Sequence, residues 1–206
     1  MLSITAIKNE HNITTHYIAQ FIDISEIKKA QQLAQHQADH DFLTGLLNRK
    51  SLLQRLNEEF IKAKRHKFVH AFLFIDLDNF KSINDNYGHD IGDKVIVEIA
   101  KRLKNMLREG DIVARISGDE FGVILLNLNA NESQAAQTVK QICDKILQSI
   151  SEELLIDKHK LSISSSIGIK MFPENEKCMN DVILFTVLVN FYKITRNSLK
   201  EHLQLT

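Results

Sequence analysis

The chain has 206 residues, of which 44% are hydrophobic and 25% are charged, a composition typical of one soluble globular domain with a short appendage. Its 26 basic residues balance 26 acidic ones, which excludes the basic surplus that a nucleic-acid or acidic-membrane binder needs. Cys143 and Cys178 lack a CxxC spacing, which argues against a zinc site or a disulfide framework.

No apolar run reaches the roughly 20 residues of a transmembrane helix, and the N-terminus lacks the basic start and apolar stretch of a signal peptide. We therefore expect a cytoplasmic domain with no nucleic-acid partner and no direct membrane contact of its own.

The first 23 residues have the pattern of a hairpin, with strands at Ser3–Lys8 and Thr14–Ile22. A lone hairpin is marginal in water, so we expect it to be the edge of a larger domain or to pair with something else. Asp23 and Glu26 have the spacing of a capping box, which predicts a helix over about Ser25–Asp39. The apolar positions of this helix share one side, typical of a face packed on the next domain or of a short coiled-coil seam.

Helices and strands alternate in the rest of the chain. We predict helices at about Arg49–Ala63, Asp93–Leu107, Glu132–Ser149 and Asp181–Thr195, and strands at Ala71–Asp76, Ile112–Ile116, Phe121–Leu126 and Leu161–Lys170. One obvious hairpin among these elements indicates an α+β fold with a mainly antiparallel sheet covered by helices. Only 7 glycines occur where average usage predicts about 14, so each is a candidate for positive φ or close ligand approach.

The sharpest local feature is an acidic turn between two apolar strands. Gly118 can supply positive φ there, and the carboxylates of Asp119 and Glu120 follow directly. Adjacent carboxylates repel, so a turn that holds them together often has a cation to hold. A solvated acidic turn is the alternative, and for an isolated S-G-D-E sequence it would be the favoured one.

A second acidic cluster begins at Asp76, where the apolar strand at 72–75 ends. If this strand lies beside the acidic turn, Asp76, Asp119 and Glu120 converge as hard oxygen ligands, which suits Mg²⁺ completed by substrate phosphates. The residues after Asp78 have the pattern of a helix start, whose N–H groups can bind a phosphate, with Lys81 as an added cation. Together these features predict a nucleotide polyphosphate site.

The segment from Asn84 to Asp93 places amides and carboxylates in a glycine-hinged loop. A carboxylate accepts from the N1–H and N2–H₂ groups of guanine, which adenine lacks, and an asparagine can read a neighbouring edge. The alternative is a loop that caps a helix beginning at Asp93, for which Asp90 and Asp93 would suffice.

Four ordered segments resemble the GGDEF family of diguanylate cyclases: D-F-L-T-G-L-L-N-R (41–49), F-I-D-L-D-N-F-K-S-I-N-D-N-Y-G-H-D-I-G-D (74–93), R-I-S-G-D-E-F (115–121) and S-S-I-G-I (165–169). The resemblance covers roughly residues 39–185. It implies a bacterial nucleotidyl-cyclase-like fold, ferredoxin-like and related to polymerase palms, and synthesis of cyclic di-GMP from two GTP with Mg²⁺ or Mn²⁺. Each domain would bind one GTP, so turnover would require a homodimer.

The resemblance also assigns roles to residues. The metal ligands it implies are Asp76, Asp119, Glu120 and the backbone carbonyl of Leu77. The substrate-binding residues it implies are Asn84 and Asp93 for guanine, the backbone N–H groups of Asn79 and Phe80 for phosphates, and Gly118 and His89 nearby. Lys81 would stabilise the transition state, and Asp119 would accept the proton of the 3′-hydroxyl.

Arg108 and Asp111 match the RxxD inhibitory motif of the family, which starts nine residues ahead of Ser117. This match implies feedback by cyclic di-GMP, with Arg108 donating to guanine O6 and N7 and Asp111 accepting from the other edge. The alternative without a ligand is a helix that ends at Gly110, with Arg108 placed favourably near the C-terminal dipole.

The first 40 residues resemble the closing hairpin and exit helix of a PAS domain. The implied division is a PAS remnant at 1–23, a signalling linker helix at 24–40 and the GGDEF domain at 41–206. A full PAS fold needs more residues, so we expect no sensory ligand pocket here and a longer, cytoplasmic or membrane-tethered parent sensor.

Two departures from the family stand out. Ser117 occupies a position where glycine is usual, a mild change. In the helix at 181–206, Tyr192 aligns with the tyrosine of the family. Thr195 stands where the family has a phosphate-binding lysine, and Leu188 stands where it has an aspartate. Weaker triphosphate binding would follow from these changes. A second hypothesis beside the cyclase is therefore a non-catalytic receptor for cyclic di-GMP or GTP, and a third is a poorly folding gene fragment.

Overall fold

The computed structural model describes residues 2–128, 131–173 and 182. The chain forms two compact units, Met1–Ala38 and Asp39–Thr206, which are treated separately below. In the part of the chain that is described, no helix combines the length and apolar character needed to cross a membrane.

The N-terminal unit is an antiparallel hairpin followed by a helix. Strands β1 (Leu2–Lys8) and β2 (Thr14–Phe21) precede α1 (Ser25–Asp39), which confirms the predicted elements. The Asp23 carboxylate accepts a hydrogen bond from the Ser25 N–H at 2.8 Å, as a helix cap does. Glu26 instead pairs with the ammonium of Lys29 at 3.1 Å.

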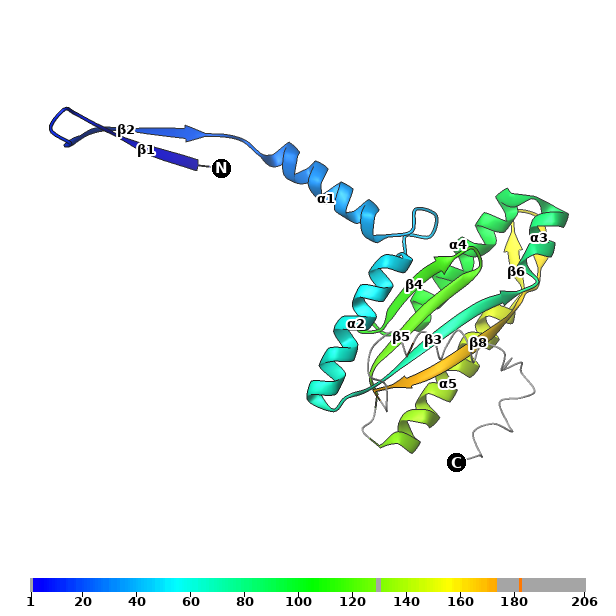
Figure 1. The fold of residues 1–206 in the computed structure, drawn as a ribbon. Helices are drawn as coiled ribbons and strands as arrows, with labels where there is room; N and C mark the ends of the chain where they lie inside the picture. Colours follow the sequence, from blue (N-terminus) through cyan, green and yellow to red (C-terminus); the bar gives the residue numbers. More distant parts are fainter. Residues whose placement is uncertain (1, 129–130, 174–181, 183–206) are drawn as a thin grey trace. The chain divides into compact units, whose positions relative to one another are not determined.

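The second unit is built on a four-stranded antiparallel sheet (Figure 1). In spatial order its strands are β4 (Ile112–Ser117), β5 (Glu120–Leu128), β3 (Val69–Asp78) and β8 (Ser164–Phe172). The other elements are α2 (Arg49–His66), α3 (Phe80–Tyr87), α4 (His89–Met106), α5 (Glu132–Ser151) and the small hairpin β6 (Leu154–Ile156) and β7 (His159–Leu161). The predicted α+β class with an antiparallel sheet is confirmed.

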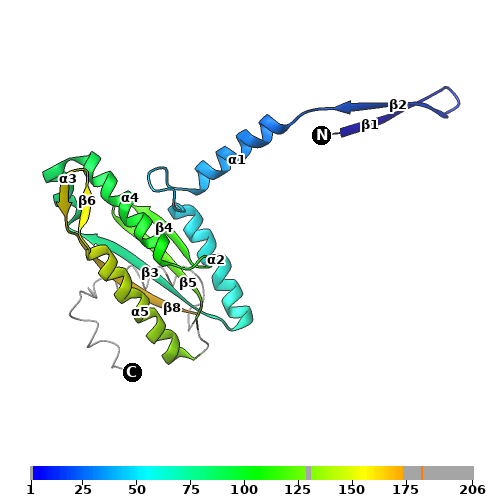
Figure 2. The same ribbon diagram turned by 180° about the vertical axis from the view of Figure 1, so that it is seen from behind.

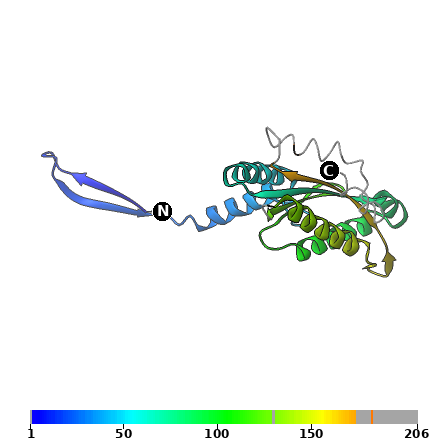
Figure 3. The ribbon, with the colours of Figure 1, turned by 90° about the horizontal axis from the view of Figure 1, so that it is seen from below.

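Alternation along β3 divides the core into two layers. Leu73, Ile75 and Leu77 belong to the cluster shared with α4 and α5, whereas Phe72 and Phe74 belong to the cluster shared with α2. Helices α4 and α5 therefore cover one face of the sheet and α2 covers the other, as the views from behind and from below show (Figures 2 and 3). Asp76 and Asp78 lie on the same face of the sheet as Phe72 and Phe74.

Gly122 lets α2 approach the centre of the sheet. A Cβ atom there would lie 2.5 Å from Cδ2 of Leu52, a side chain that is almost fully buried. The close contact fixes α2, and with it the segment that leads into α2, against β4 and β5.

Two predicted elements need correction, and a third lies almost entirely outside the described residues. The helix predicted to begin at Asp93 begins at His89, because α4 continues almost directly from α3. The strand predicted at Leu161–Lys170 is divided, since Leu161 closes the unpredicted β6–β7 hairpin and β8 starts at Ser164. The predicted C-terminal helix, with Leu188, Tyr192 and Thr195, lies outside the described residues, except that Val182 is helical and buried.

Candidate functional site

The two acidic segments meet at one end of the sheet. Asp76 at the end of β3 lies directly opposite Glu120 of β5, so their side chains share a face. The N–H group of Leu77 donates to the carbonyl oxygen of Asp119 at 3.3 Å. The backbones of Asp76, Asp119 and Glu120 therefore lie close together at this end of the sheet.

The turn between β4 and β5 is braced by its own side chains. Gly118 has φ of 42°, a conformation that costs glycine little, and its carbonyl accepts from Nε of Arg115 at 2.9 Å. The hydroxyl of Ser117 donates to the carboxylate of Glu120. The serine that replaces the usual glycine thus contacts one of the two acids of the turn without occupying the position that needs positive φ.

The donor set at this end of the sheet fits a divalent cation. Like charges directly opposite each other across two strands, here Asp76 and Glu120, repel, and a cation between them would offset that repulsion. Among the described residues no three His, Cys, Asp or Glu side chains cluster closely enough to hold a metal by themselves. Mg²⁺ does not need such a cage, because one or two carboxylates with substrate phosphates and water complete its shell.

The start of α3 offers backbone donors next to these acids. Asn79 adopts the left-handed conformation with φ of 56°, which asparagine tolerates, and it gives α3 no side-chain cap. The first N–H groups of the helix therefore point to a ligand or to solvent. Asp78 is committed elsewhere, since its two oxygens accept from the hydroxyls of Ser164 and Ser166 at 2.7 and 2.8 Å. Lys81 is exposed in the first turn.

Helices α3 and α4 form an elbow at Gly88, whose φ is 85°. Asn84 lies on α3, and its side-chain oxygen would be 1.9 Å from a Cβ atom at Gly92 of α4. Asp93 is exposed in the second turn of α4, so it does not cap that helix, and the alternative in which Asp90 and Asp93 serve as caps is wrong. His89 is exposed at the first position of α4.

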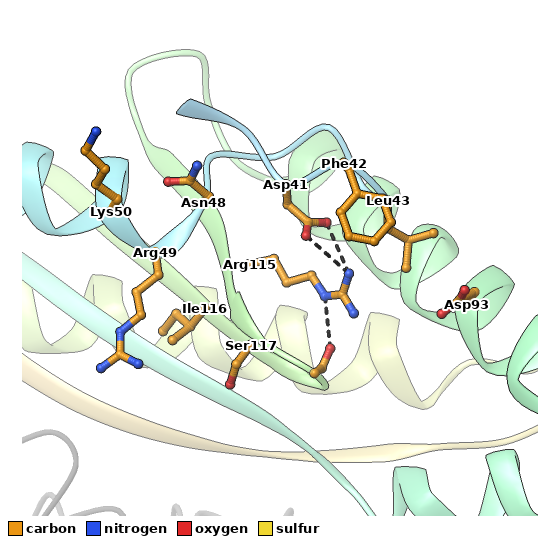
Figure 4. A pocket seen from close by; sticks show the side chains of 11 residues that line it. Asp41, Phe42, Leu43, Asn48, Arg49, Lys50, Asp93, Arg115, Ile116 and Ser117 are labelled. Carbon is orange, nitrogen blue, oxygen red and sulfur yellow. Dashed lines mark hydrogen bonds and ion pairs between the residues drawn. The ribbon is translucent and has the colours of Figure 1, made fainter. Parts of the chain in front are cut away.

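A cavity of about 390 Å³ connects the elbow with the acidic turn (Figure 4). Its lining comes from α4, from β4 and its turn, and from the segment that enters α2. The lining residues are Asp41, Phe42, Leu43, Asn48, Arg49, Lys50, Asp93, Arg115, Ile116, Ser117 and Gly118. Phe42 is 97% exposed, which is unusual for a phenylalanine. Asp93 and Gly118, two of the predicted substrate-binding residues, therefore line one cavity.

An ion pair in the wall of this cavity was not identified from the sequence. The guanidinium of Arg115 donates to the carboxylate of Asp41 at 3.1 Å (Figure 4). Asp41 also accepts from the N–H and hydroxyl of Thr44 at 2.9 and 2.7 Å. Burial raises the pKa of Asp41, but the bonds from Thr44 and Arg115 together outweigh burial and hold that pKa below its usual value. Partners 74 positions apart give no local signal in the sequence.

Arg108 and Asp111 are also brought together, beside a separate cavity of about 250 Å³. Nε of Arg108 donates to Asp111 at 3.1 Å, and the guanidinium also donates to the carbonyl of Leu126. The Asp111 carboxylate accepts from the Leu126 N–H at 3.1 Å and is 4% exposed. Helix α4 ends at Met106, so the alternative of a helix ending at Gly110 is wrong.

Comparison with known proteins gives one consistent family. The model described as "Diguanylate cyclase, GGDEF domain" matches residues 38–185. Diguanylate cyclase TpbB of Pseudomonas aeruginosa (strain UCBPP-PA14) is 44% identical over 141 residues, which cover 68% of this chain and 31% of that protein. The bifunctional diguanylate cyclase/cyclic di-GMP phosphodiesterase MucR of P. aeruginosa is 38% identical over 145 residues, covering 70% of this chain and 20% of MucR. The chain thus spans about a third or less of the length of these relatives.

Solved structures agree with the fold. The GGDEF domain of PA1120 (TpbB or YfiN) from P. aeruginosa matches with a TM-score of 0.68 and 37% identity, covering 74% of this chain and 86% of that chain. The coiled coil and GGDEF domain of DgcB from Caulobacter crescentus, solved in complex with c-di-GMP, matches with a TM-score of 0.73, covering 82% of this chain and 86% of that chain. At 22% identity the DgcB match supports the fold alone.

Proposed function

Because the chain belongs to the GGDEF family of diguanylate cyclase domains, we propose that it condenses two GTP molecules into cyclic di-GMP and two pyrophosphates. The observation that carries the proposal is the meeting of Asp76, Asp119 and Glu120 at the sheet end, next to the uncapped start of α3. Acids, backbone donors and an amide-and-carboxylate elbow lie on consecutive elements around this end, as a metal–nucleotide site requires.

The proposed metal ligands are Asp76, Asp119, Glu120 and the carbonyl of Leu77. Bound there, Mg²⁺ or Mn²⁺ would neutralise charge on the transferring phosphoryl group. The chain's own residues would then hold the nucleotide. The N–H groups of Asn79 and Phe80 would donate to phosphate oxygens, and Lys81 would stabilise the charge that develops on them.

The guanine base would be held at the elbow. The Asp93 carboxylate accepts well from N1–H and N2–H₂, and the Asn84 amide can read the neighbouring edge. His89 lies at the start of α4 on the same elbow, and Gly118 keeps side-chain atoms out of the cavity that Asp93 also lines. The close fit of Asn84 on Gly92 supports a preorganised base site.

The chemistry needs two domains face to face, each with one GTP. Asp119 would accept the proton of the 3′-hydroxyl, and the freed oxygen would attack the α-phosphorus of the other GTP. The new bond joins O3′ to that phosphorus while the bond to the β-phosphate oxygen breaks and pyrophosphate leaves. Repeating the step in the opposite direction closes the ring, so we propose a homodimer as the active species.

We also propose product inhibition by cyclic di-GMP at Arg108 and Asp111. Arg108 is more than half exposed, so its guanidinium can turn from Leu126 toward a guanine edge, whereas Asp111 is tied to the β5 backbone. With Arg108→Ala, cyclic di-GMP added at the start should no longer slow turnover. Inhibition as strong as in the wild type would remove Arg108 from the inhibitory site.

The N-terminal unit is proposed to be a PAS remnant at 1–23 with a linker helix at 24–40 that relays a signal from a longer parent protein. A non-catalytic receptor for cyclic di-GMP or GTP is the second hypothesis. The sequence departure at Leu188 and Thr195 favours it, because a missing lysine weakens triphosphate binding.

The test of the proposed function is incubation of the purified chain with GTP and Mg²⁺ at high protein concentration, with chromatographic detection of cyclic di-GMP. Formation of cyclic di-GMP that disappears in Asp119→Ala is the expected result. No product, combined with cyclic di-GMP binding that Arg108→Ala abolishes, would show a receptor instead.

A further inference from the structure

The small hairpin β6–β7 contacts both arms of the α3–α4 elbow. We propose that this hairpin positions the elbow, so that Asn84 and Asp93 stay in place for a guanine base. The inference rests on the proposed function for the identity of the ligand. It assigns a role to Tyr87, Lys94 and the hairpin tip, none of which belongs to the site described above.

The first contact holds α4. Nζ of Lys94 lies 2.6 Å from Oδ2 of Asp157 at the tip of the hairpin. Lys94 directly follows Asp93, so this ion pair restrains the turn of α4 that presents Asp93. Asp157 reaches it from a left-handed conformation with φ of 52°.

The second contact holds α3. The ring of Tyr87, the last residue of α3, meets the ring of His159 edge to face, with centroids 5.2 Å apart and an angle of 63° between the planes. Tyr87 precedes Gly88 and Lys94 follows it, so the hairpin contacts the elbow on both sides of its hinge. Gly88 itself offers little resistance to bending, since glycine has the widest range of backbone angles.

The hairpin can serve as a fixed support because its base is anchored. Leu154, Ile156 and Leu161 are buried in the cluster that α4 and α5 share. Helix α3, by contrast, has only eight residues and one buried side chain, Ile83. A helix of two turns is marginal without tertiary contacts, so its orientation depends on what it packs against.

Each contact alone is modest. The Lys94 and Asp157 side chains are 52% and 54% exposed, and an ion pair of that kind changes an equilibrium by a few-fold at most. An aromatic pair contributes a similar factor. Removal of both should therefore weaken guanine binding by about 10-fold without unfolding the domain.

The test compares Asp157→Ala/His159→Ala with the control Lys160→Ala. Lys160 lies in the same hairpin and pairs with Glu153 at 3.0 Å, and both side chains are more than half exposed. Binding is measured with 3′-deoxy-GTP and 3′-deoxy-ITP in Mg²⁺, which lack the attacking hydroxyl. Hydrogen exchange is measured for amides 80–93.

We expect the double variant to bind 3′-deoxy-GTP about 10-fold more weakly, to discriminate less against 3′-deoxy-ITP, which lacks the N2 amino group, and to exchange faster at 80–93. Lys160→Ala should match the wild type. The charge exchange Lys94→Asp/Asp157→Lys should restore slow exchange relative to Lys94→Asp alone.

Unchanged exchange at 80–93 in the double variant, or the same change in Lys160→Ala, would overturn the inference. Failure of the wild type to bind 3′-deoxy-GTP would count against the proposed function instead. The exchange measurement would still decide whether the hairpin holds the elbow.

Discussion

At the scale of single residues, two close contacts shape the candidate site. Asn84 and Gly92 face each other across the elbow, and Asp41 and Arg115 meet in the cavity wall. Both contacts set where a neighbouring functional group lies, and both are open to substitution.

Gly92→Ala should keep the fold and lose nucleotide affinity. The new methyl group would lie 1.9 Å from the Asn84 side-chain oxygen, which is too close, so the Asn84 amide must move aside. Because Ala favours a helix interior by about 1 kcal/mol over Gly, the variant should melt no earlier than the wild type. Calorimetric binding of 3′-deoxy-GTP should weaken by about 10-fold or more, the cost of one displaced hydrogen bond.

Gly110→Ala is the matched control, because a Cβ atom there would meet nothing within 4 Å. Equal nucleotide affinity in Gly92→Ala and the wild type would mean that Asn84 does not contact the base.

Asp41→Asn should destabilise the domain by about 1–3 kcal/mol at pH 7, since it removes a charged partner from Arg115. The pKa of Asp41 is lower in the folded chain than in the unfolded chain. The stabilisation is therefore present above about pH 4 and is lost as pH falls through the folded-state pKa. Urea unfolding at pH 7 and pH 3 should show the gap between variant and wild type shrinking at pH 3. A gap that stays constant would contradict this assignment.

At the scale of secondary structure, apolar periodicity was enough to predict most elements, because buried strands such as β3 and β5 are continuous apolar runs. It could not predict the β6–β7 hairpin, whose strands have three residues each and are fixed by burial of Leu154 and Leu161. The start of α4 could not be predicted, because Gly88 and the polar residues around it have the pattern of a loop. In the structure Gly88 alone separates α3 from α4.

The two acidic segments are adjacent because β3 pairs with β5, and the apolar periodicity together with the order of the motifs suggests that pairing. The Asp41–Arg115 pair could not be predicted in this way, because it depends on how the segment before α2 is held over β4. In the structure that placement is marked by the bond from the Arg115 N–H to the carbonyl of Leu47 at 2.9 Å and by the bridge between Leu47 and Ala114.

Gly122→Ala should loosen α2. The added Cβ atom would stand 2.5 Å from Leu52 and 3.1 Å from Ile116, so the helix or its side chains must move, at a cost of about 1–3 kcal/mol. The free energy of unfolding in urea should fall by that amount. The double variant Gly122→Ala/Leu52→Ala should lose less stability than the sum of the losses in the two single variants, because the Leu52 side chain is what the new methyl group would clash with. Strict additivity would show that α2 does not approach Gly122 this closely.

At the scale of the whole molecule, activity is proposed to belong to two copies of the chain, each of which is proposed to hold one GTP. Excess Asp119→Ala chain should therefore lower cyclic di-GMP formation per wild-type chain, because mixed pairs lack one proton acceptor and one metal ligand. The measurement is product formation at fixed wild-type concentration with increasing variant. Product formation that does not respond to a large excess would contradict a shared reaction.

One end of the sheet is proposed to bind a metal and GTP together. A crystal structure of the chain with 3′-deoxy-GTP and Mn²⁺ tests it most directly, because the anomalous signal of manganese locates the ion independently of the nucleotide. We predict a manganese peak among Asp76, Asp119 and Glu120, phosphates at the start of α3, and guanine at Asn84 and Asp93. A nucleotide bound elsewhere, or no manganese at the end of β3, would contradict the proposed metal–nucleotide site.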